Sequence, residues 1–249
     1  MAKYIYHEAD SRGDANHGWL HSRHTFSFGG YMDAERMNFG VLRVLNDDYV
    51  SGGMGFGRHP HSNMEIISIP LEGELAHNDS MGNGSVIKPG DIQVMSAGTG
   101  IEHSEYNHSE VDPVKFLQIW VIPNKQNVEP RYDQQAIDKE KTHNNFLQIL
   151  SPNADDEGVW IHQNAWFHLA AFDAGYTREY VLKDPNNGLY VFVGLLVHLH
   201  RLLAHGYYLI GTAVNGYYRW LVNYNFIVMY NEGIGCAKVN GNLLRQKIK

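Results

Sequence analysis

The chain has 249 residues, of which 43% are hydrophobic and 19% charged, a composition that excludes an intrinsically disordered protein. Its formal net charge of −7 argues against nucleic acid as the main partner, and its single cysteine excludes an internal disulfide framework and indicates a reducing compartment. The N-terminal sequence is polar and predicts no secretory signal, so we expect a cytoplasmic protein.

Short strands separated by glycine and polar turns are predicted along the first half of the chain. The signals are alternation of apolar and polar residues, or short apolar runs bounded by turn residues. The predicted strands are 25–28, 40–46, 66–71, 73–78, 92–95 and 115–122, with a turn at Asp47–Asp48, a loop at 79–84 and a type II turn at Lys88–Asp91. Few segments show a helical period, so the pattern favours an all-β sandwich or jelly-roll barrel.

The second half begins after a polar segment, 123–141, which contains two prolines and which we interpret as a linker. Strands are predicted again at 146–150, 159–163 and 167–172. Residues 1–193 contain 14 basic and 26 acidic side chains, a net charge of −12, whereas residues 194–249 contain 6 and 1, a net charge of +5. The composition therefore changes near residue 194.

Two histidine-containing pairs suggest a metal site. His59 and His61 are one residue apart, as are His103 and Glu105. In a strand, residues i and i+2 face the same side, so two neighbouring strands could direct three imidazoles and one carboxylate to one point. This donor set suits a divalent first-row metal with open positions, and we rank Fe(II) first, then Mn, Ni or Co, with Zn and Cu after them. The spacing alone leaves open that HPH is a surface turn and HSE a polar strand end.

Longer motifs resemble the pirin family of the cupin superfamily, in particular its bacterial quercetinase-like members. They cover roughly residues 1–193 and include HGWLHSRHTFSFGGY, GFGRHPHSNMEI, AHNDSMGN, PGDIQVMSAGTGIEHSEYN and PRYDQQ. The resemblance implies a bicupin, in which two jelly-roll (double-stranded β-helix) barrels contain little helix. We expect an N-terminal metal-binding cupin domain at 1–125 and a metal-free, cupin-like C-terminal domain at 126–249 that is atypical after about residue 194.

The resemblance also implies metal ligands at His59, His61, His103 and Glu105. The activity it implies is that of a metal-dependent quercetin 2,3-dioxygenase, which opens a flavonol ring with O2 and releases carbon monoxide. Glu105 would then also act as the general base that takes the substrate hydroxyl proton. The expected partners are a small aromatic or enolic substrate and O2, with neither nucleic acid nor membrane.

Two alternatives stay open at this point. Eukaryotic pirin is regarded as an iron-dependent partner of transcription regulators, so this chain could be a non-enzymatic, redox-sensing protein that contacts regulatory proteins. Quercetin could also stand in for another enolic or catecholic substrate.

Residues outside the four expected ligands have more modest interpretations. Glu65 is expected to orient a metal-site histidine, with direct metal ligation as the alternative, and Asn107 to close a turn by hydrogen bonding. His77 is expected to be a surface histidine, with a place lining the barrel mouth as the alternative. His198 and His200 form another H-x-H pair, but without a following acidic motif we expect no second metal site there. The basic, apolar sequence from Gly194 suggests paired buried strands or an altered coding region rather than a membrane span, since charged and histidine residues interrupt it.

Overall fold

A computed structural model describes residues 5–173, 176, 178–196 and 223–232, with residues 194–196 and 223–232 described by their backbone alone. Sixteen strands and two short 3₁₀ helices, Ala9–Ser11 and Lys139–Thr142, make up the described regular structure, which confirms the all-β prediction. Among these residues there is no helix with the length and apolar character needed to cross a membrane.

The contacts divide the chain into two compact units. The N-terminal unit comprises Arg12–Ile137 and Leu150–Ala165, and the C-terminal unit comprises Met1–Ser11, Asp138–Ile149 and Trp166–Lys249. The division expected at residue 125 stays a prediction.

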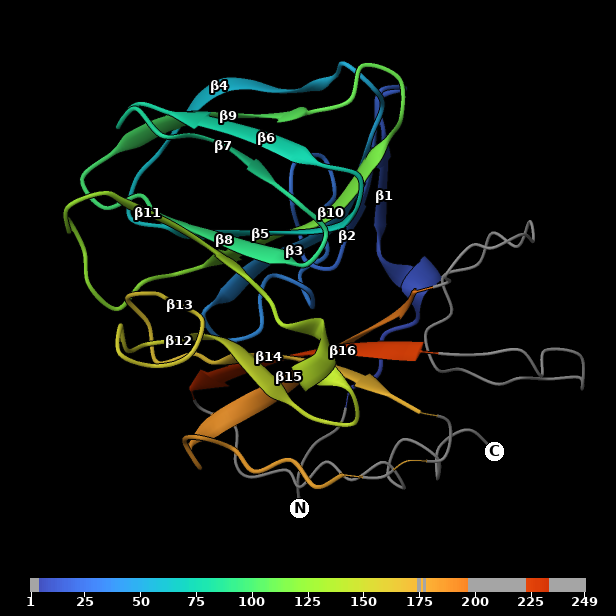
Figure 1. The fold of residues 1–249 in the computed structure, drawn as a ribbon, viewed down its shortest axis with the longest axis vertical. Helices are drawn as coiled ribbons and strands as arrows, with labels where there is room; N and C mark the ends of the chain where they lie inside the picture. The colour runs from blue at the N-terminus through green and yellow to red at the C-terminus, as the bar shows by residue number, and fades with distance from the viewer. Residues whose placement is uncertain (1–4, 174–175, 177, 197–222, 233–249) are drawn as a thin grey trace, which may run out of the picture. The chain divides into compact units, whose positions relative to one another are not determined.

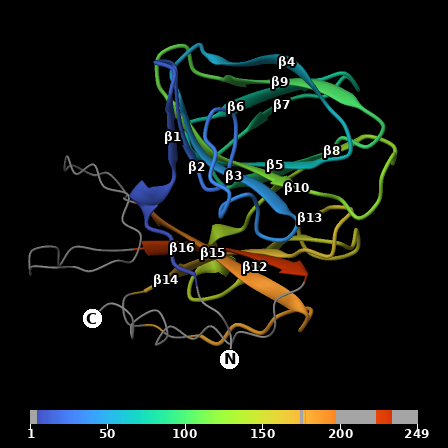
Figure 2. The same ribbon diagram turned by 180° about the vertical axis from the view of Figure 1, so that it is seen from behind.

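Two antiparallel sheets form the main part of the N-terminal unit and face each other (Figures 1 and 2). The seven-stranded sheet has the order β1 (Gly13–Asn16), β2 (Leu20–His24), β3 (Leu42–Val50), β10 (Val114–Val121), β5 (Glu65–Glu72), β8 (Asp91–Ser96) and β11 (Arg131–Ala136). The four-stranded sheet has the order β4 (Gly55–His61), β9 (Ile101–Asn107), β6 (Leu75–Asp79) and β7 (Gly84–Ile87). A double sheet of this kind buries the inner face of each sheet against the other.

The space between the two sheets is apolar at both ends and polar in the middle. One apolar cluster contains Leu20, Val50, Leu75, Ile87, Val114 and Phe116, and the other contains Ile66, Met95, Ala97 and Ile101. Between them, one register row crosses five strands of the large sheet with only polar side chains: Asn46, Gln118, Ser68, Gln93 and Gln134. Four of these five residues are no more than 6% exposed, so the sequence places hydrogen-bonding groups deep inside the unit.

Several strands differ from their predicted limits. The turn expected at Asp47–Asp48 is wrong, because both residues lie inside β3, where Asp47 pairs with Arg12 at 3.3 Å and Asp48 accepts a hydrogen bond from the Ser22 hydroxyl. The strand expected at 25–28 is also wrong, since β2 ends at His24. Part of the expected linker forms β11, which pairs with β8.

Other local predictions are confirmed. The turn before β8 has Pro89 and Gly90 at its centre, the φ angle of Gly90 is +103°, and the Asp91 amide donates to the Lys88 carbonyl at 2.8 Å. The strands predicted at 66–71, 73–78, 92–95 and 115–122 correspond to β5, β6, β8 and β10.

The C-terminal unit contains β14 (Phe167–Phe172), β16 (Asn223–Glu232) and β15 (Asn187–Leu196), in that order and antiparallel. β13 (Val159–Trp160) belongs to the N-terminal unit, where it pairs in parallel with the last two residues of β12 (Leu147–Ser151). The interpretation of His198 and His200, and most of the expected atypical tail, fall outside the described residues.

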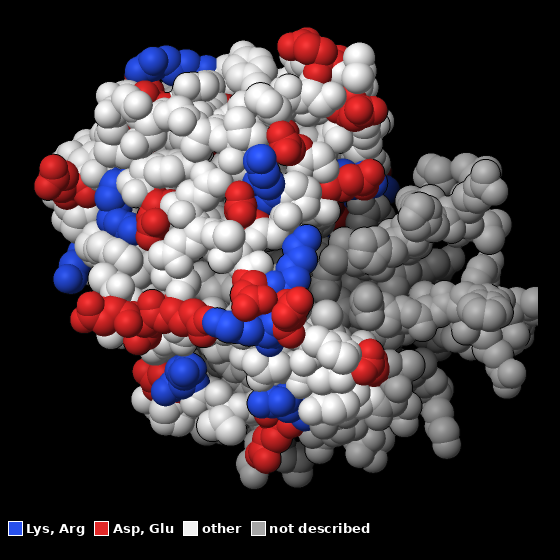
Figure 3. Space-filling model, in the orientation of Figure 1, with Lys and Arg blue, Asp and Glu red and all other residues white. Residues whose placement is uncertain are grey.

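Charged side chains on the described face in Figure 3 are interspersed by sign. Exposed ion pairs include Arg58–Glu102 at 2.7 Å and Lys115–Glu72 at 2.6 Å. Such exposed pairs each contribute about 0–1 kcal/mol, so the stability of the unit rests mainly on its interior.

Candidate metal centre

The two predicted pairs lie on neighbouring strands of the four-stranded sheet. His59 and His61 are the last alternate residues of β4, and His103 and Glu105 are alternate residues of β9. β4 and β9 are antiparallel, with His59 directly opposite His103. The alternation along β9 is regular, since Ile101, His103, Glu105 and Asn107 are buried and the residues between them are more exposed. The two i, i+2 pairs therefore lie on adjacent strands, and their role as metal ligands stays a prediction.

Three of the four predicted ligands come together as one group. The nitrogens of His59, His61 and His103 lie within 4.8 Å of one another. Their ring centroids are 4.4 Å apart for His59 and His103, 4.9 Å for His59 and His61, and 5.0 Å for His61 and His103. Glu105 belongs instead to a second group, with His77 and His103, whose ligand atoms also lie within 4.8 Å of one another.

Two of the three histidines, His61 and His103, are in the neutral form that a metal requires. Burial lowers the pKa of His103 to about 3 and the pKa of His61 to about 4, and the neighbouring imidazoles add to both shifts, so these rings are neutral at pH 7. His59 Nδ1 lies 2.7 Å from the Gly57 carbonyl oxygen, which requires the proton on Nδ1 and leaves the Nε2 lone pair free. Neutral imidazole is the form that binds divalent metals.

Glu105 is completely buried and is held by two donors from the opposite sheet. The Ser68 hydroxyl donates to one carboxylate oxygen at 2.8 Å, and the Gln118 amide donates to the other at 3.2 Å. Both donors belong to the polar row that crosses the seven-stranded sheet. They orient the carboxylate within the barrel, and sequence reasoning missed them. The available signal was one uncharged polar residue in the middle of each of two mainly apolar strands, EIISIPLE and VKFLQIWV.

Two expectations about neighbouring residues are wrong. Glu65 accepts hydrogen bonds from the Ser96 hydroxyl at 2.6 Å and from the His162 main chain, and alternation along β5 places it on the opposite face from Ser68. It therefore does not orient a metal-site histidine. His77 is not a surface residue, because it is 0% exposed and lies directly across from Glu105 in β6. Asn107 does close the turn after β9, where its amide donates to the carbonyls of Val50 and Asp112, as expected.

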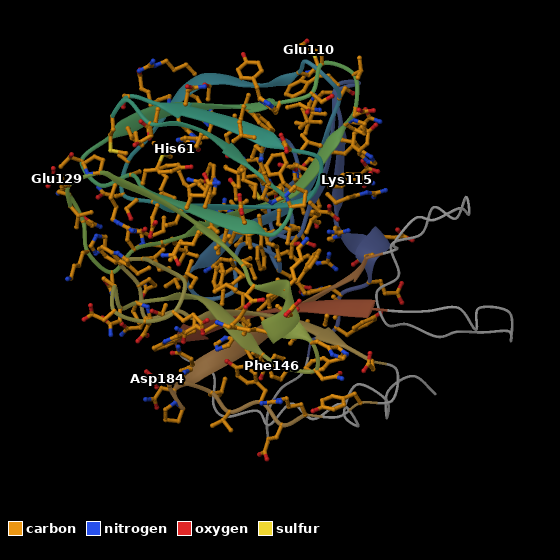
Figure 4. All side chains as sticks on the ribbon, viewed as in Figure 1. His61, Glu110, Lys115, Glu129, Phe146 and Asp184 are labelled. Atoms are coloured by element: carbon orange, nitrogen blue, oxygen red, sulfur yellow. The ribbon has the colours of Figure 1, made fainter. Side chains whose placement is uncertain are left out.

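An open cavity of about 520 Å³ is lined by one residue of the histidine group, His61. Its lining includes Pro60, Ser62, Ser80 and residues 100–102. In Figure 4, His61 lies under β4 on the inner side of the small sheet. Its ring also contacts the indole of Trp120, with centroids 4.9 Å apart. The size is within the range of about 300–1,000 Å³ that is usual for small-molecule sites.

The residues fit a divalent metal on structural grounds. Buried imidazole nitrogens normally find hydrogen-bond partners, because leaving them unpaired is costly. Yet His61 Nε2, His77 Nδ1 and both ring nitrogens of His103 are buried without a partner among the residues the structure describes. A metal would satisfy such nitrogens, and three imidazoles with one carboxylate form a donor set for first-row ions. Two facing sheets, with this set on two neighbouring strands of one of them, are typical of the cupin class of metal-binding β-barrels.

Comparison with known proteins identifies the family within that class. Residues 6–121 match the Pirin family, and residues 148–194 match the quercetinase C-terminal cupin domain. The quercetin 2,3-dioxygenase of Escherichia coli K12 is 48% identical over 157 residues, covering 63% of this chain and 67% of that protein. A putative quercetin 2,3-dioxygenase of Pseudomonas aeruginosa is 44% identical over 176 residues, covering 70% and 75%. The chain belongs to the pirin family.

Solved structures agree with this assignment. The crystal structure of YhhW from Escherichia coli has a TM-score of 0.69 and 34% identity, and the match covers 93% of each chain. The complex of the bacterial pirin YhhW with nickel(II) has the same TM-score, 33% identity, and covers 92% of this chain and 93% of that one. With cupin matches in both halves of the sequence, the predicted bicupin fold is confirmed.

Proposed function

We propose that this chain is a metal-dependent dioxygenase that opens the heterocyclic ring of a flavonol such as quercetin with O2 and releases carbon monoxide. The observation that supports this most directly is the group formed by His59, His61 and His103, which adjoins the buried Glu105 and a cavity of suitable size. The activity named for the Escherichia coli relative at 48% identity supports the reaction class. The single Cys236 supports the cytoplasm as its compartment.

One divalent ion would be held by His59, His61, His103 and Glu105. We rank Fe(II) first and Mn, Ni or Co next, and the nickel(II) complex of the related bacterial pirin supports an ion of this series. When bound, the ion supplies Lewis acidity, which favours the deprotonated form of a substrate hydroxyl. The remaining requirements fall on the chain itself.

In this proposal Glu105 takes the hydroxyl proton of the substrate. Its carboxylate is buried, and the Ser68 and Gln118 donors hold it in one orientation from the opposite sheet. A general base works best when its position is fixed and water is excluded, and this interior satisfies both conditions.

The cavity beside His61 would receive the aromatic substrate. Pro60 and Ile101 supply apolar surface, while Ser62 and Ser80 supply hydroxyl groups. The indole nitrogen of Trp120, whose ring contacts His61, is buried and has no hydrogen-bond partner in the described part of the chain. An apolar surface with a few polar groups is what a planar phenolic compound requires.

The test is to reconstitute metal-free protein with Fe(II), Mn(II), Ni(II) or Co(II) and to follow loss of the quercetin absorbance under O2. We expect Glu105→Gln to retain much of the metal and to lose about 10²–10⁴-fold in turnover, the usual contribution of a general base. Glu72→Gln is the matched control, since Glu72 is an exposed carboxylate at the end of β5 and should leave turnover unchanged.

Full activity of Glu105→Gln would refute its role as base. Stoichiometric metal without turnover of quercetin in any reconstituted form would instead favour the redox-sensing alternative, and turnover of other enolic or catecholic compounds alone would identify quercetin as a surrogate.

A further inference from the structure

A fifth metal-ligating side chain lies inside the barrel. His77 is on β6, on the other side of β9 from His59 and His61. It faces Glu105 across the strand pair, and Asp79, two residues later, faces His103. The group of His77, His103 and Glu105 is more deeply buried than the histidines of β4, since its members are 0%, 2% and 0% exposed.

Hydrogen bonding determines which nitrogen of His77 is available. Its Nε2 lies 3.3 Å from one Asp79 oxygen. That carboxylate also accepts from the main-chain amides of Met81 and Asn83 and from the Asn83 side chain, at 2.8–3.0 Å. With so many donors the carboxylate is ionised, and it therefore requires the His77 proton on Nε2. The lone pair is then on Nδ1.

The Nδ1 atom of His77 has no hydrogen-bond partner within the described structure. A carboxylate that holds one nitrogen of a histidine while the other faces a metal is the usual support of a metal ligand. Asp79 and His77 have this arrangement, and both side chains are 0% exposed.

The plane of the His77 ring is fixed as well. Tyr132 of β11 stacks on it, with ring centroids 4.9 Å apart and an interplanar angle of 29°. The Tyr132 hydroxyl donates to Gln134 at 2.8 Å and also bonds with the Ser85 hydroxyl. Most buried polar atoms have a hydrogen-bond partner, whereas the His77 ring is held in place by Asp79 and Tyr132 with its Nδ1 unpaired among the described residues.

We propose that His77, His103 and Glu105 form an inner position for a divalent transition metal, an alternative to the outer position of His59 and His61, with which it shares His103 and Glu105. Both ring nitrogens of His103 are buried without a partner among the described residues, so it can serve either position. The inner set contains two imidazoles and one carboxylate, which suits the same first-row ions. The inference rests on the proposed function in one respect, that a metal binds inside this barrel.

The experiment uses Co(II), whose visible absorption reports its coordination geometry, and full-length protein freed of metal. Metal per chain is measured by elemental analysis after desalting, beside the absorption spectrum and the dissociation constant. The double variant His59→Ala/His61→Ala removes the outer donors and leaves the inner group. We expect it to retain Co(II) with a spectrum that differs from that of the wild-type protein.

Adding His77→Phe to the double variant should remove the retained Co(II), since the ring remains for Tyr132 to stack on but offers no nitrogen. His77→Gln, which can still donate to Asp79, is made in parallel in case the phenylalanine variant does not fold. Asp79→Asn in the double-variant background should weaken Co(II) binding about 10–100-fold, the usual loss when the support of a ligand is removed. His108→Ala, at an exposed histidine after β9, is the matched control and should change neither binding nor spectrum.

Loss of all Co(II) in the double variant, with normal binding by the wild-type protein, would overturn the inner position and leave the outer site intact. Retention of equal Co(II) after both His77 replacements would overturn it too. If the wild-type protein binds none of Co(II), Ni(II) or Mn(II), the metal site of the proposed function fails, and the inner position fails with it.

Discussion

Asp48 is the residue whose ionisation should most clearly affect folding. Burial, the largest effect, raises its pKa from an ordinary 3.8 to about 7; the hydrogen bond from Ser22 opposes this, and the charges of Asp47 and Glu105 add to it. The folded chain therefore binds more protons than the unfolded chain between about pH 4 and pH 7, so this carboxyl lowers stability as the pH rises through that range. Above about pH 7 this loss of folding stability is complete and changes no further with pH.

Asp48→Asn should abolish that cost, because an amide cannot ionise and can still accept the Ser22 hydrogen bond. We expect the free energy of unfolding to rise by roughly 2–4 kcal/mol at pH 8 and to change much less at pH 4, since each unit of pKa shift corresponds to about 1.4 kcal/mol. Urea unfolding at a series of pH values measures this.

The neighbouring residue provides a matched control for Asp48. Asp47 pairs with Arg12 at 3.3 Å, and both side chains are 8% exposed. Asp47→Asn should therefore lower stability at pH 8, the opposite sign. If Asp48→Asn leaves the pH dependence of unfolding unchanged, Asp48 is not the group that lowers stability between about pH 4 and pH 7.

At the scale of elements, the turn that leads from β5 in the large sheet to β6 in the small sheet depends on Gly73. Its φ angle is +73°, and a Cβ there would lie 2.6 Å from the Pro113 carbonyl oxygen and 3.0 Å from Val114 Cα at the start of β10. Gly73→Ala should thus cost about 1–3 kcal/mol for the left-handed backbone, plus a further loss from displacing β10. Chemical denaturation measures the difference.

A variant at Gly82 distinguishes the cost of backbone strain from the cost of displacing β10. It also has a positive φ angle, +90°, but no atom within 4 Å of its Cβ position in the described structure. Gly82→Ala should cost only the backbone strain, so equal losses in the two variants would show that the contact with β10 is unimportant.

Local sequence patterns predict several strands and the four expected ligands, but not the burial of Asp47 and Asp48. β5, β8 and β10 are apolar runs between turn residues, and His59, His61, His103 and Glu105 follow the two-residue period of a strand, so they were predictable. Two consecutive carboxylates usually lie at the surface, so the sequence predicts a turn at Asp47 and Asp48. Their burial depends on Arg12 and Ser22, which only the tertiary fold brings beside β3.

The roles of His77 and β11 likewise depend on tertiary neighbours, so the local sequence does not predict them. His77 and Asp79 repeat the i, i+2 spacing of the other pairs. The pairing of β6 with β9, which brings them to the other ligands, cannot be inferred from the spacing of residues along the chain. β11 is mainly polar, RYDQQA, and its side chains contact neighbouring strands: Tyr132 stacks on His77, and Gln134 continues the polar row. Cross-strand partners, not the periodicity within a strand, determine these roles.

At the scale of the whole molecule, every residue of the inner and outer positions belongs to the N-terminal unit. A ligand that binds only the folded state stabilises it by about 2.7 kcal/mol at a concentration 100 times its dissociation constant. Adding Ni(II) to metal-free protein should therefore slow amide hydrogen exchange in peptides from β4, β6 and β9, and should leave β14 of the C-terminal unit little changed.

A chelator should reverse the effect, and His59→Ala/His61→Ala should reduce it in β4 more than in β6 if the inner position remains. Protection confined to β14, with stoichiometric Ni(II) bound, would place the metal elsewhere in the chain.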